Sequence, residues 1–233
     1  MKTLAIIPAR GGSKRIPKKN VKDFLGQPII NYSIDAALNA GCFDEVMVST
    51  DDPEIAEIAK KAGAKIPFMR SRITSGDFST TVDVIKEVLD EYRKIGKHPE
   101  YVCCIYPTAP FITSGKLLNA FNLISSKKAE SVVPVVRFSF PILRSFKIED
   151  GLVKLNWPEY RDYRSQDLPL SFHDCGQFYL LHVPTFLEKF TLFPEHTLPL
   201  EMAESEVQDI DNDEDWKIAE LKYKIQYMNS NIR

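Results

Sequence analysis

The sequence has no hydrophobic run that approaches the roughly 20 consecutive apolar residues of a membrane-spanning helix. Its first residues also lack the apolar core of a secretory signal, because Pro8, Arg10 and Lys14 interrupt the apolar run there. The formal net charge is only -2 over 233 residues, which argues against nucleic-acid binding over a broad surface. We therefore expect a cytoplasmic globular protein, and this length suits one α/β domain with a substantial core.

Cysteine is scarce, and its spacing does not suit a metal site. Of the four cysteines, Cys103 and Cys104 are adjacent in an apolar run, while Cys42 and Cys175 stand alone. No zinc-type spacing results. We expect buried, reduced thiols, and nothing beside Cys175 indicates a nucleophile.

The stretch LAIIPARGGSKRIPKKN at 4–20 has neither P-loop spacing nor the dinucleotide fingerprint. An apolar run at 4–7 instead predicts a buried strand that opens into a loop with two glycines and a serine. Five cations share this loop: Arg10, Lys14, Arg15, Lys18 and Lys19. Ligands of open α/β sheets bind beyond the carboxyl ends of strands, and cations with glycine amides suit phosphates. A solvated cationic loop is the alternative, but this position favours a polyphosphate site.

Downstream, apolar patterns of strand and helix type alternate. They predict strands at 45–50, 64–69, 101–106, 131–136, 177–183 and 207–210, and helices at 29–40, 53–62, 81–95, 114–124, 184–189 and 214–226. This succession indicates a parallel sheet with right-handed crossovers. Residues 70–80 read as a loop. The stretch 137–170 breaks the pattern, with a hairpin turn predicted at Gly151, and we interpret it as a flap or an oligomer arm.

Asp209 and Asp211 carry a second chemical signal. At the end of the strand predicted at 207–210, residues two apart point the same way. Two converging carboxylates repel unless a cation lies between them, and Mg²⁺ prefers such oxygen ligands together with substrate phosphates. Helix capping is the alternative, and it suits the acidic residues at 213–215. A polyphosphate loop with a magnesium pair predicts phosphoryl or nucleotidyl transfer by positioning and charge neutralisation.

These motifs, with VSTDD at 48–52, PTAP at 107–110 and DIDNDEDW at 209–216, resemble the CMP-sialic acid synthetase (acylneuraminate cytidylyltransferase) family over nearly the whole chain. CCIYPTAPF at 103–111, RSQDL at 164–168 and HDCGQFY at 173–179 are most similar to the pseudaminic acid branch of that family. The resemblance implies one α/β domain over 1–233, a three-layer Rossmann-like nucleotidyltransferase fold with a mostly parallel sheet. It also implies a homodimer whose small dimerisation excursion, at 137–170, reaches the partner's site, and a role in flagellin glycosylation.

The reaction that the resemblance implies joins CTP to a nine-carbon α-keto acid sugar, giving the CMP-sugar and pyrophosphate. The anomeric hydroxyl would attack the α-phosphorus in line. Arg10, Lys14 and Asp211 would be catalytic, Asp209 and Asp211 would bind Mg²⁺, and either Asp211 or a metal-bound hydroxyl would serve as general base. The implied nucleotide-binding residues are Pro8, Ala9, Arg10, Gly11, Gly12, Ser13, Lys14, Lys19, Asn20, Arg70, Ser79 and Thr80.

The implied sugar site depends on a turn that departs from the family pattern. Sialic acid enzymes usually read QPTSPLR there, and this chain reads YPTAPFI, so Tyr106 and Ile112 replace a glutamine and an arginine that flank the sugar. Because an unpaired polar group in a pocket is discriminating, we expect pseudaminic acid rather than N-acetylneuraminate. The implied substrate-binding residues are Tyr106, Thr108, Arg164, Gln166, Asp167, His173, Asp174 and Gln177.

Arg164 is the first choice for the cation beside the sugar carboxylate, with Arg144 and Lys147 behind it. His173 also suits a purely structural role, Tyr179 suits the core, and the aromatic residues within 138–146 suit packing or dimer contacts. The alternative functions are an N-acylneuraminate, legionaminate or KDO cytidylyltransferase and a non-catalytic nucleotide-sugar-binding module. The carboxylate pair favours an enzyme, because a binding module has little need of two metal ligands.

Overall fold

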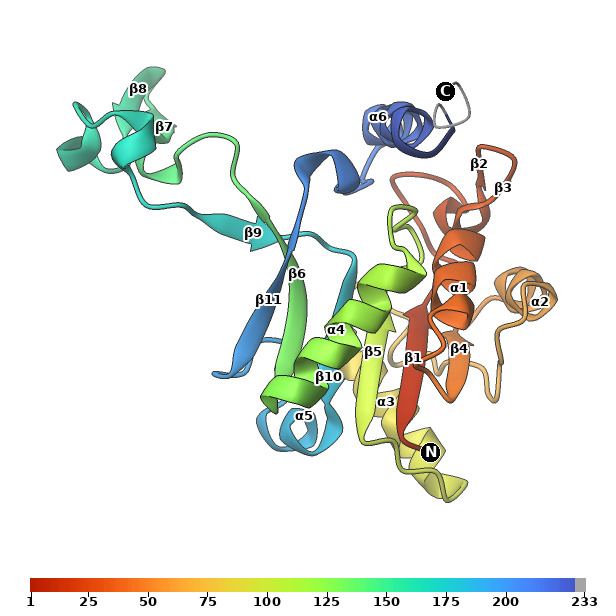
Figure 1. Ribbon diagram of the computed structural model, residues 1–233. Coiled ribbons are helices and arrows are strands. Elements are labelled where there is room, and N and C mark those ends of the chain that lie inside the picture. Colours follow the sequence, from red (N-terminus) through yellow and green to blue (C-terminus); the bar gives the residue numbers. More distant parts are fainter. Residues whose placement is uncertain (229–233) are drawn as a thin grey trace.

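In the computed structural model, which describes residues 1–228, a seven-stranded sheet lies between two layers of helices (Figure 1). Its strand order is β11-β6-β10-β5-β1-β4, with β9 paired to β6. The strands are β1 (Thr3–Pro8), β4 (Glu45–Ser49), β5 (Tyr101–Ile105), β6 (Ser131–Arg137), β9 (Phe172–Asp174), β10 (Phe178–His182) and β11 (Thr197–Met202). Only β9 and β10 run antiparallel to their neighbours, so the sheet is mostly parallel, as predicted.

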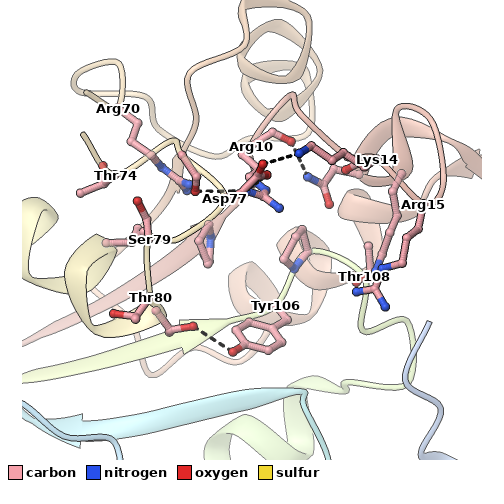
Figure 2. A pocket seen from close by; sticks show the side chains of 18 of the residues that line it. Arg10, Lys14, Arg15, Arg70, Thr74, Asp77, Ser79, Thr80, Tyr106 and Thr108 are labelled. Atoms are coloured by element: carbon pink, nitrogen blue, oxygen red, sulfur yellow. Dashed lines mark hydrogen bonds and ion pairs between the residues drawn. The ribbon is translucent and has the colours of Figure 1, made fainter. Parts of the chain in front are cut away.

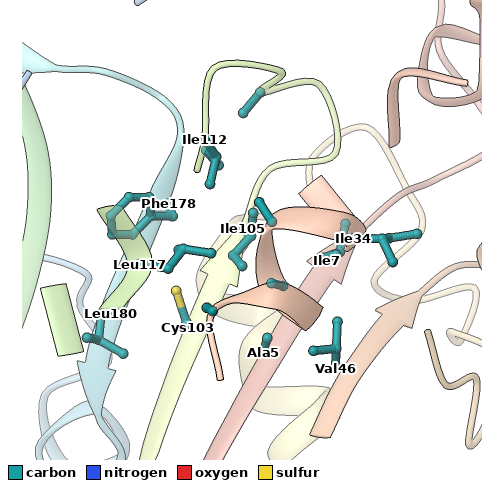
Figure 3. Close-up of a cluster of buried hydrophobic side chains, with 14 of the residues drawn as sticks. Ala5, Ile7, Ile34, Val46, Cys103, Ile105, Ile112, Leu117, Phe178 and Leu180 are labelled. Carbon is teal, nitrogen blue, oxygen red and sulfur yellow. The ribbon is translucent and has the colours of Figure 1, made fainter. Parts of the chain in front are cut away.

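Each face of the sheet is covered because successive side chains of a strand point to opposite faces. From β1, Ala5 and Ile7 pack with α1 (Ile29–Asn39), α2 (Pro53–Lys61) and α4 (Ser114–Lys127) (Figure 3). Leu4 and Ile6 pack on the other side with α3 (Thr81–Lys94) and α5 (Val183–Lys189). This three-layer arrangement and all six predicted helices are confirmed, the last as α6 (Asp213–Tyr223), which continues into a π-helical turn.

The stretch after β6 leaves the three layers and carries a hairpin of β7 (Phe146–Glu149) and β8 (Leu152–Leu155) (Figure 1). Its turn contains Asp150 and Gly151, both with positive φ, so the hairpin predicted at Gly151 is confirmed. The chain returns to the sheet through β9. A smaller hairpin, β2 (Asp23–Phe24) and β3 (Gln27–Pro28), lies before α1.

Two predicted strands are wrong. Residues 64–69 contribute only one bridge, between Met47 and Lys65, because Pro67 has no N–H for the ladder. Residues 207–210 have no regular structure, and only Ile210 of that run is deeply buried. The strand of this region is β11, at the sheet edge, where Pro199 is tolerated.

The cysteines fit the expectation of reduced thiols. Cys103, Cys104 and Cys175 are buried, Cys42 is half-buried, and all four are free. Within residues 1–228 we find no helix that combines the length and apolar character needed to cross a membrane.

Candidate active site

A cavity of about 430 Å³ lies where β1 and β5 end, at the carboxyl edge of the sheet. Ligands of open α/β sheets bind at this edge, and the volume suits a small molecule. The loop after β1, the loop before α3 and the turn after β5 form its walls. Of the predicted nucleotide-binding residues, it is lined by Pro8, Arg10, Ser13, Lys14, Lys19, Asn20, Arg70, Ser79 and Thr80.

Positive charge dominates this first cavity. Five cations line it: Arg10, Lys14, Arg15, Lys19 and Arg70. Among residues 1–228, two carboxylates, Asp77 and Asp211, face them, so the cavity attracts a polyanion. Four of the cations come from the loop that the sequence singled out, and Arg15 was predicted as part of that loop but not as a site residue.

The loop after β1 is held in place by backbone contacts. The side chain of Asn20 is buried and donates from Nδ2 to the carbonyl of Arg10 at 2.9 Å. The amide of Gly11 donates to Oδ1 of Asp51 at 3.0 Å. A Cβ at Gly11 would lie 2.5 Å from Oδ2 of Asp52, so any other residue there would force the side chain that caps α2 to shift.

Three predicted nucleotide-binding residues do not line the cavity. Ala9 is buried, and its amide donates to the carbonyl of Ser49. The amide of Gly11 donates to Oδ1 of Asp51. Gly12 also lies outside the lining. The expectation that glycine amides of this loop suit phosphates therefore has no support at Gly11 or Gly12, and the side chains of the loop provide the charge instead.

Arg70 lines the opposite wall, fixed to the end of β4. Its Nε donates to Oγ of Ser49 at 3.0 Å, and its Nη2 donates to the Ser49 carbonyl. Burial lowers the pKa of Arg70. Ser79 and Thr80 follow on the same wall, and Thr80 caps α3 by accepting the amide of Asp83 at 3.2 Å.

Asp77, which the sequence did not single out, faces the loop cations across the cavity (Figure 2). Its Oδ1 accepts a hydrogen bond from Nη1 of Arg10 at 3.0 Å, and its Oδ2 pairs with Nζ of Lys14. The hydrogen bond from Lys14 and its charge hold the pKa of Asp77 below the usual range. Nη1 of Arg10 also donates to the carbonyl of Gly76 at 3.1 Å.

Asp211 lines the cavity from the other end of the chain. Its Oδ2 lies 2.8 Å from Nη1 of Arg15, and its Oδ1 lies 3.9 Å from Nζ of Lys19. Lys19 also donates to the carbonyl of Ile210, and burial lowers the pKa of Lys19. The carboxylate of Asp215 accepts the amide of Asp211 at 2.9 Å, so this segment is joined to the capped start of α6.

Capping by the acidic residues at 213–215 is confirmed. Asn212 is the N-cap of α6 and accepts the amides of Glu214 and Asp215 at 2.8 and 3.0 Å. Asp213, Glu214 and Asp215 form the acidic first turn, where carboxylates interact favourably with the helix dipole.

A second cavity, of about 540 Å³, adjoins the first at Tyr106, which lines both. Its walls come from β6, β9, β10 and the segment before α6. They include Arg137, His173, Asp174, Tyr179, Asp209 and Lys222. Of the predicted substrate-binding residues, this cavity therefore brings together Tyr106, His173 and Asp174, while Thr108 lines the first cavity.

Tyr106 is held between the cavities by two neighbours. Its hydroxyl lies 2.9 Å from Oγ1 of Thr81, and its ring meets that of Tyr179 edge-on with centroids 5.7 Å apart. Burial raises the pKa of Tyr106. Tyr179 is buried as predicted, yet it also borders the second cavity and donates its hydroxyl to Asp174.

Several predicted sugar contacts lie elsewhere in this chain. Arg164 pairs with Asp167 on the excursion at 2.7 Å, and Gln166 lines a separate cavity there. Gln177 is buried and donates to the carbonyl of Glu206 at 2.7 Å. Ile112 is buried in the core with Leu117 and Phe178 (Figure 3), not at a sugar-binding surface. The excursion residues miss the site because this segment extends away from the sheet.

The two further cations proposed for the sugar carboxylate are also on the excursion. Arg144 donates to Oγ of Ser165 at 3.2 Å, and Lys147 pairs with Glu149 at 2.7 Å. The cations that do line the second cavity are Arg137 and Lys222. Lys222 donates to the carbonyl of Val207 at 2.8 Å, whereas the side chain of Arg137 forms no ion pair with residues 1–228.

Asp209 and Asp211 supply two carboxylates of the kind that suits Mg²⁺, but the strand predicted to align their side chains is absent. Burial and the nearby charge of Asp211 raise the pKa of Asp209. Asp211 borders the first cavity and Asp209 the second. In residues 1–228 no group of three or more metal-ligating side chains occurs, and Mg²⁺ is usually held by one or two carboxylates with waters and substrate phosphates.

Comparisons with known proteins agree with this geometry. A family model described as Cytidylyltransferase matches residues 4–212. The chain is 39% identical over 228 residues to the pseudaminic acid cytidylyltransferase of Campylobacter jejuni, covering 97% of this chain and 98% of that one. It is 31% identical over 224 residues to the CMP-N,N'-diacetyllegionaminic acid synthase of Legionella pneumophila, covering 94% and 95%.

Among solved structures, that of CMP:2-keto-3-deoxy-manno-octonic acid synthetase complexed with CTP is similar to this chain. The TM-score is 0.68 at 17% sequence identity, and the match covers 95% of this chain and 98% of that one. At this identity the likeness concerns the fold alone, and it confirms the predicted nucleotidyltransferase architecture.

Proposed function

The chain belongs to the cytidylyltransferase family, which makes it a nucleotidyltransferase, and on that premise we propose that it transfers CMP from CTP to pseudaminic acid. The products would be the CMP-sugar and pyrophosphate. One observation carries this proposal: a cationic cavity and a second cavity meet at Tyr106 and at the pair Asp209 and Asp211. Such a junction suits a nucleotide on one side and an acceptor sugar on the other.

CTP would occupy the first cavity with its triphosphate toward the loop after β1. Arg10 and Lys14 are the main phosphate ligands in this proposal, and Lys19 and Asn20 close the loop around them. The cytosine would lie near Pro8 and Arg70, since Arg70 is fixed by its bonds to Ser49. Cations neutralise charge that develops as the bond to pyrophosphate breaks.

Mg²⁺ would be held by Asp209 and Asp211 with phosphate oxygens as further ligands, where it would neutralise charge on the reacting phosphates. The carboxylate pair also lies between the two cavities, so it is in position to accept the proton of the attacking anomeric hydroxyl. The amide of Asp211 is bound by Asp215, which orients this segment before the substrates arrive.

The sugar would occupy the second cavity with its carboxylate on Arg137. This guanidinium has no ion-pair partner within residues 1–228, and arginine binds carboxylates in a bidentate manner. Asp174 and His173 would accept or donate hydrogen bonds to hydroxyl and N-acetyl groups. Tyr106 would contact both substrates, as its place between the cavities suggests.

We further propose a cytoplasmic homodimer built as one domain with its excursion. The excursion exposes large apolar side chains, including Phe140 at 84%, Ile148 at 77% and Val153 at 65%. Clustered exposed apolar residues mark interaction surfaces, and a second copy of the chain is the partner that the family resemblance implies. In such a dimer Arg164 and Gln166 of the excursion would reach the partner's sugar cavity, and the product would serve flagellin glycosylation.

A pyrophosphate-release assay tests the proposed reaction. The protein is mixed with CTP, Mg²⁺ and one of four sugars: pseudaminic acid, N-acetylneuraminate, N,N'-diacetyllegionaminate or KDO. We expect release with pseudaminic acid at a kcat/KM well above that of the others. Turnover of N-acetylneuraminate without turnover of pseudaminic acid would refute the sugar assignment, and binding of CTP without turnover of any sugar would favour a binding module.

A further inference from the structure

The two cations proposed to bind the triphosphate are already paired with a carboxylate of the protein itself. Asp77 accepts a hydrogen bond from Arg10 at 3.0 Å and pairs with Lys14. These are the two cations to which the proposed function assigns the phosphates. Asp77 lines the same cavity, so its carboxylate lies where a phosphate oxygen would otherwise be bound.

This contact is not built as a permanent part of the fold. The side chain of Asp77 is 42% exposed and that of Lys14 is 77% exposed, and ion pairs at such exposure contribute little to folding stability. Within residues 1–228 the side chain of Asp77 has no partner other than Arg10 and Lys14. A polyphosphate with several charged oxygens is therefore able to replace it.

The side chain of Asp77 can leave the cations without any change at the two ends of its segment. On one side Thr74 is buried and bound to Glu87, and on the other Thr80 caps α3. Between them, Phe78 is 99% exposed, so it does not hold the segment against the core. The hydrogen bonds that hold residues 75–79, such as those from Ser75 to the Ser71 carbonyl at 2.7 Å and from Ser79 to the Ile73 carbonyl at 2.9 Å, do not involve the Asp77 side chain. A rotation of that side chain can therefore release the cations while the backbone stays in place.

We propose, resting on the function proposed above, that Asp77 is an internal competitor for the phosphate subsite. It occupies Arg10 and Lys14 in the empty enzyme, is displaced by CTP, and returns as pyrophosphate departs. This competition affects specificity, because an anion must carry more negative charge than one carboxylate to displace Asp77 from Arg10 and Lys14. The consequence for turnover is faster product release, because the returning carboxylate replaces pyrophosphate on the same cations.

The test is calorimetric binding of inorganic pyrophosphate and of CTP, each with Mg²⁺ and without sugar. We expect Asp77→Asn to bind pyrophosphate about three- to tenfold more tightly than the unaltered protein, from the loss of two exposed ion pairs. Asp77→Glu, which keeps the charge, should restore the original affinity. Asp90→Asn is the matched control: it removes one carboxylate from neighbouring α3, where Asp90 pairs with Lys86 outside the cavity, and should leave the affinity within about twofold.

The outcomes separate this inference from the proposed function. If the unaltered protein binds CTP but Asp77→Asn binds pyrophosphate equally or more weakly, Asp77 orients the cations and the inference is wrong. The same holds if Asp90→Asn tightens binding as much, since the effect would then be one of net charge. If the unaltered protein binds neither CTP nor pyrophosphate, the proposed function itself fails. In turnover, Asp77→Asn should also show stronger inhibition by added pyrophosphate.

Discussion

Nη1 of Arg15 lies 2.8 Å from Oδ2 of Asp211, so one of the two proposed metal ligands is already bound to a cation of the protein. The arrangement mirrors that of Asp77, an anion bound to the proposed phosphate cations. In both places a side chain of the chain itself supplies the charge that a substrate or metal would bring. The site still keeps a net positive charge before anything binds, because five cations line the first cavity with these two carboxylates.

The contact between Arg15 and Asp211 predicts how Mg²⁺ affinity changes when Arg15 is replaced by an uncharged residue. Arg15→Gln should bind Mg²⁺ a few-fold more tightly in the absence of nucleotide, because Asp211 loses its competing cation. Isothermal titration of the nucleotide-free protein with Mg²⁺ measures this. Lys18→Gln is the control, since Lys18 pairs with Glu54 outside the cavity. Equal or weaker Mg²⁺ binding in Arg15→Gln would mean that Asp211 does not bind the metal.

Asp209 is expected to matter for turnover far more than for nucleotide binding. Asp209→Ala should lower kcat by at least about a hundredfold, since it removes a preorganised charge beside the reacting phosphates. CTP should still bind, because Arg10 and Lys14 remain. Stopped assays of Mg²⁺-dependent pyrophosphate release give kcat, and calorimetry gives CTP affinity. Asp213→Ala, in the first turn of α6, is the control, and a comparable loss there would point to a folding defect.

Glu45 predicts how stability depends on pH. It is buried at the start of β4 and accepts hydrogen bonds from Lys97 at 2.7 Å and from Tyr92 at 2.5 Å. Burial raises the pKa of Glu45, but these hydrogen bonds outweigh it, so the net pKa lies below the usual value. Because the folded pKa is lowered, the stabilisation is present above the unfolded value, near 4.5, and is lost as the pH falls through the folded value.

Glu45→Gln should therefore lower the free energy of unfolding at neutral pH by about 1.5–3 kcal/mol, the range for hydrogen bonds to a charged group. The difference from the unaltered protein should shrink as the pH falls below about 4. Urea unfolding at several pH values measures both effects. A difference that stays constant across this range would show that packing of Glu45, and not its charge, stabilises the fold. Glu57→Gln, at an exposed pair with Lys60, provides the control.

The position of the basic loop was predictable because its information is local in the sequence. The alignment of Asp209 and Asp211 was not, because it depended on a strand at 207–210 that the structure does not contain. A buried strand followed at once by five cations predicts a cationic loop at the carboxyl edge of the sheet, and four of those cations line the first cavity. Asp77 offered no such signal. It lies 63 and 67 residues from its two partners, inside a polar loop, and only the folding of that loop over the cavity brings them together.

The errors in strand assignment have a physical cause as well. β11 alternates weakly, and only Met202 among its residues is deeply buried, since an edge strand has fewer neighbours. The run at 207–210 contains Ile210, which is buried against the aromatic cluster around Phe24 and Trp216. Apolar character alone cannot distinguish such an anchor from a strand. Likewise, Arg164 was predicted to bind the sugar carboxylate because it lies in the motif RSQDL. Arg137, the last residue of β6, lies in no such motif and was not predicted.

Arg137 and Arg164 lead to opposite expectations for the sugar carboxylate, and kinetics separate them. Arg137 lines the second cavity of its own chain, so Arg137→Ala should raise KM for the sugar about ten- to a hundredfold, the cost of losing a charged hydrogen bond. KM for CTP should stay within about twofold, and Arg137→Lys should recover part of the loss, because lysine keeps the charge but not the fork geometry.

Arg164 pairs with Asp167 on the excursion, so Arg164→Ala should act only through a partner subunit. Arg161→Ala, on the same excursion but in neither cavity, serves as the control. A large rise in sugar KM for Arg164→Ala with none for Arg137→Ala would move the carboxylate site to the partner's excursion, and sedimentation of both variants would show whether the dimer itself had been lost.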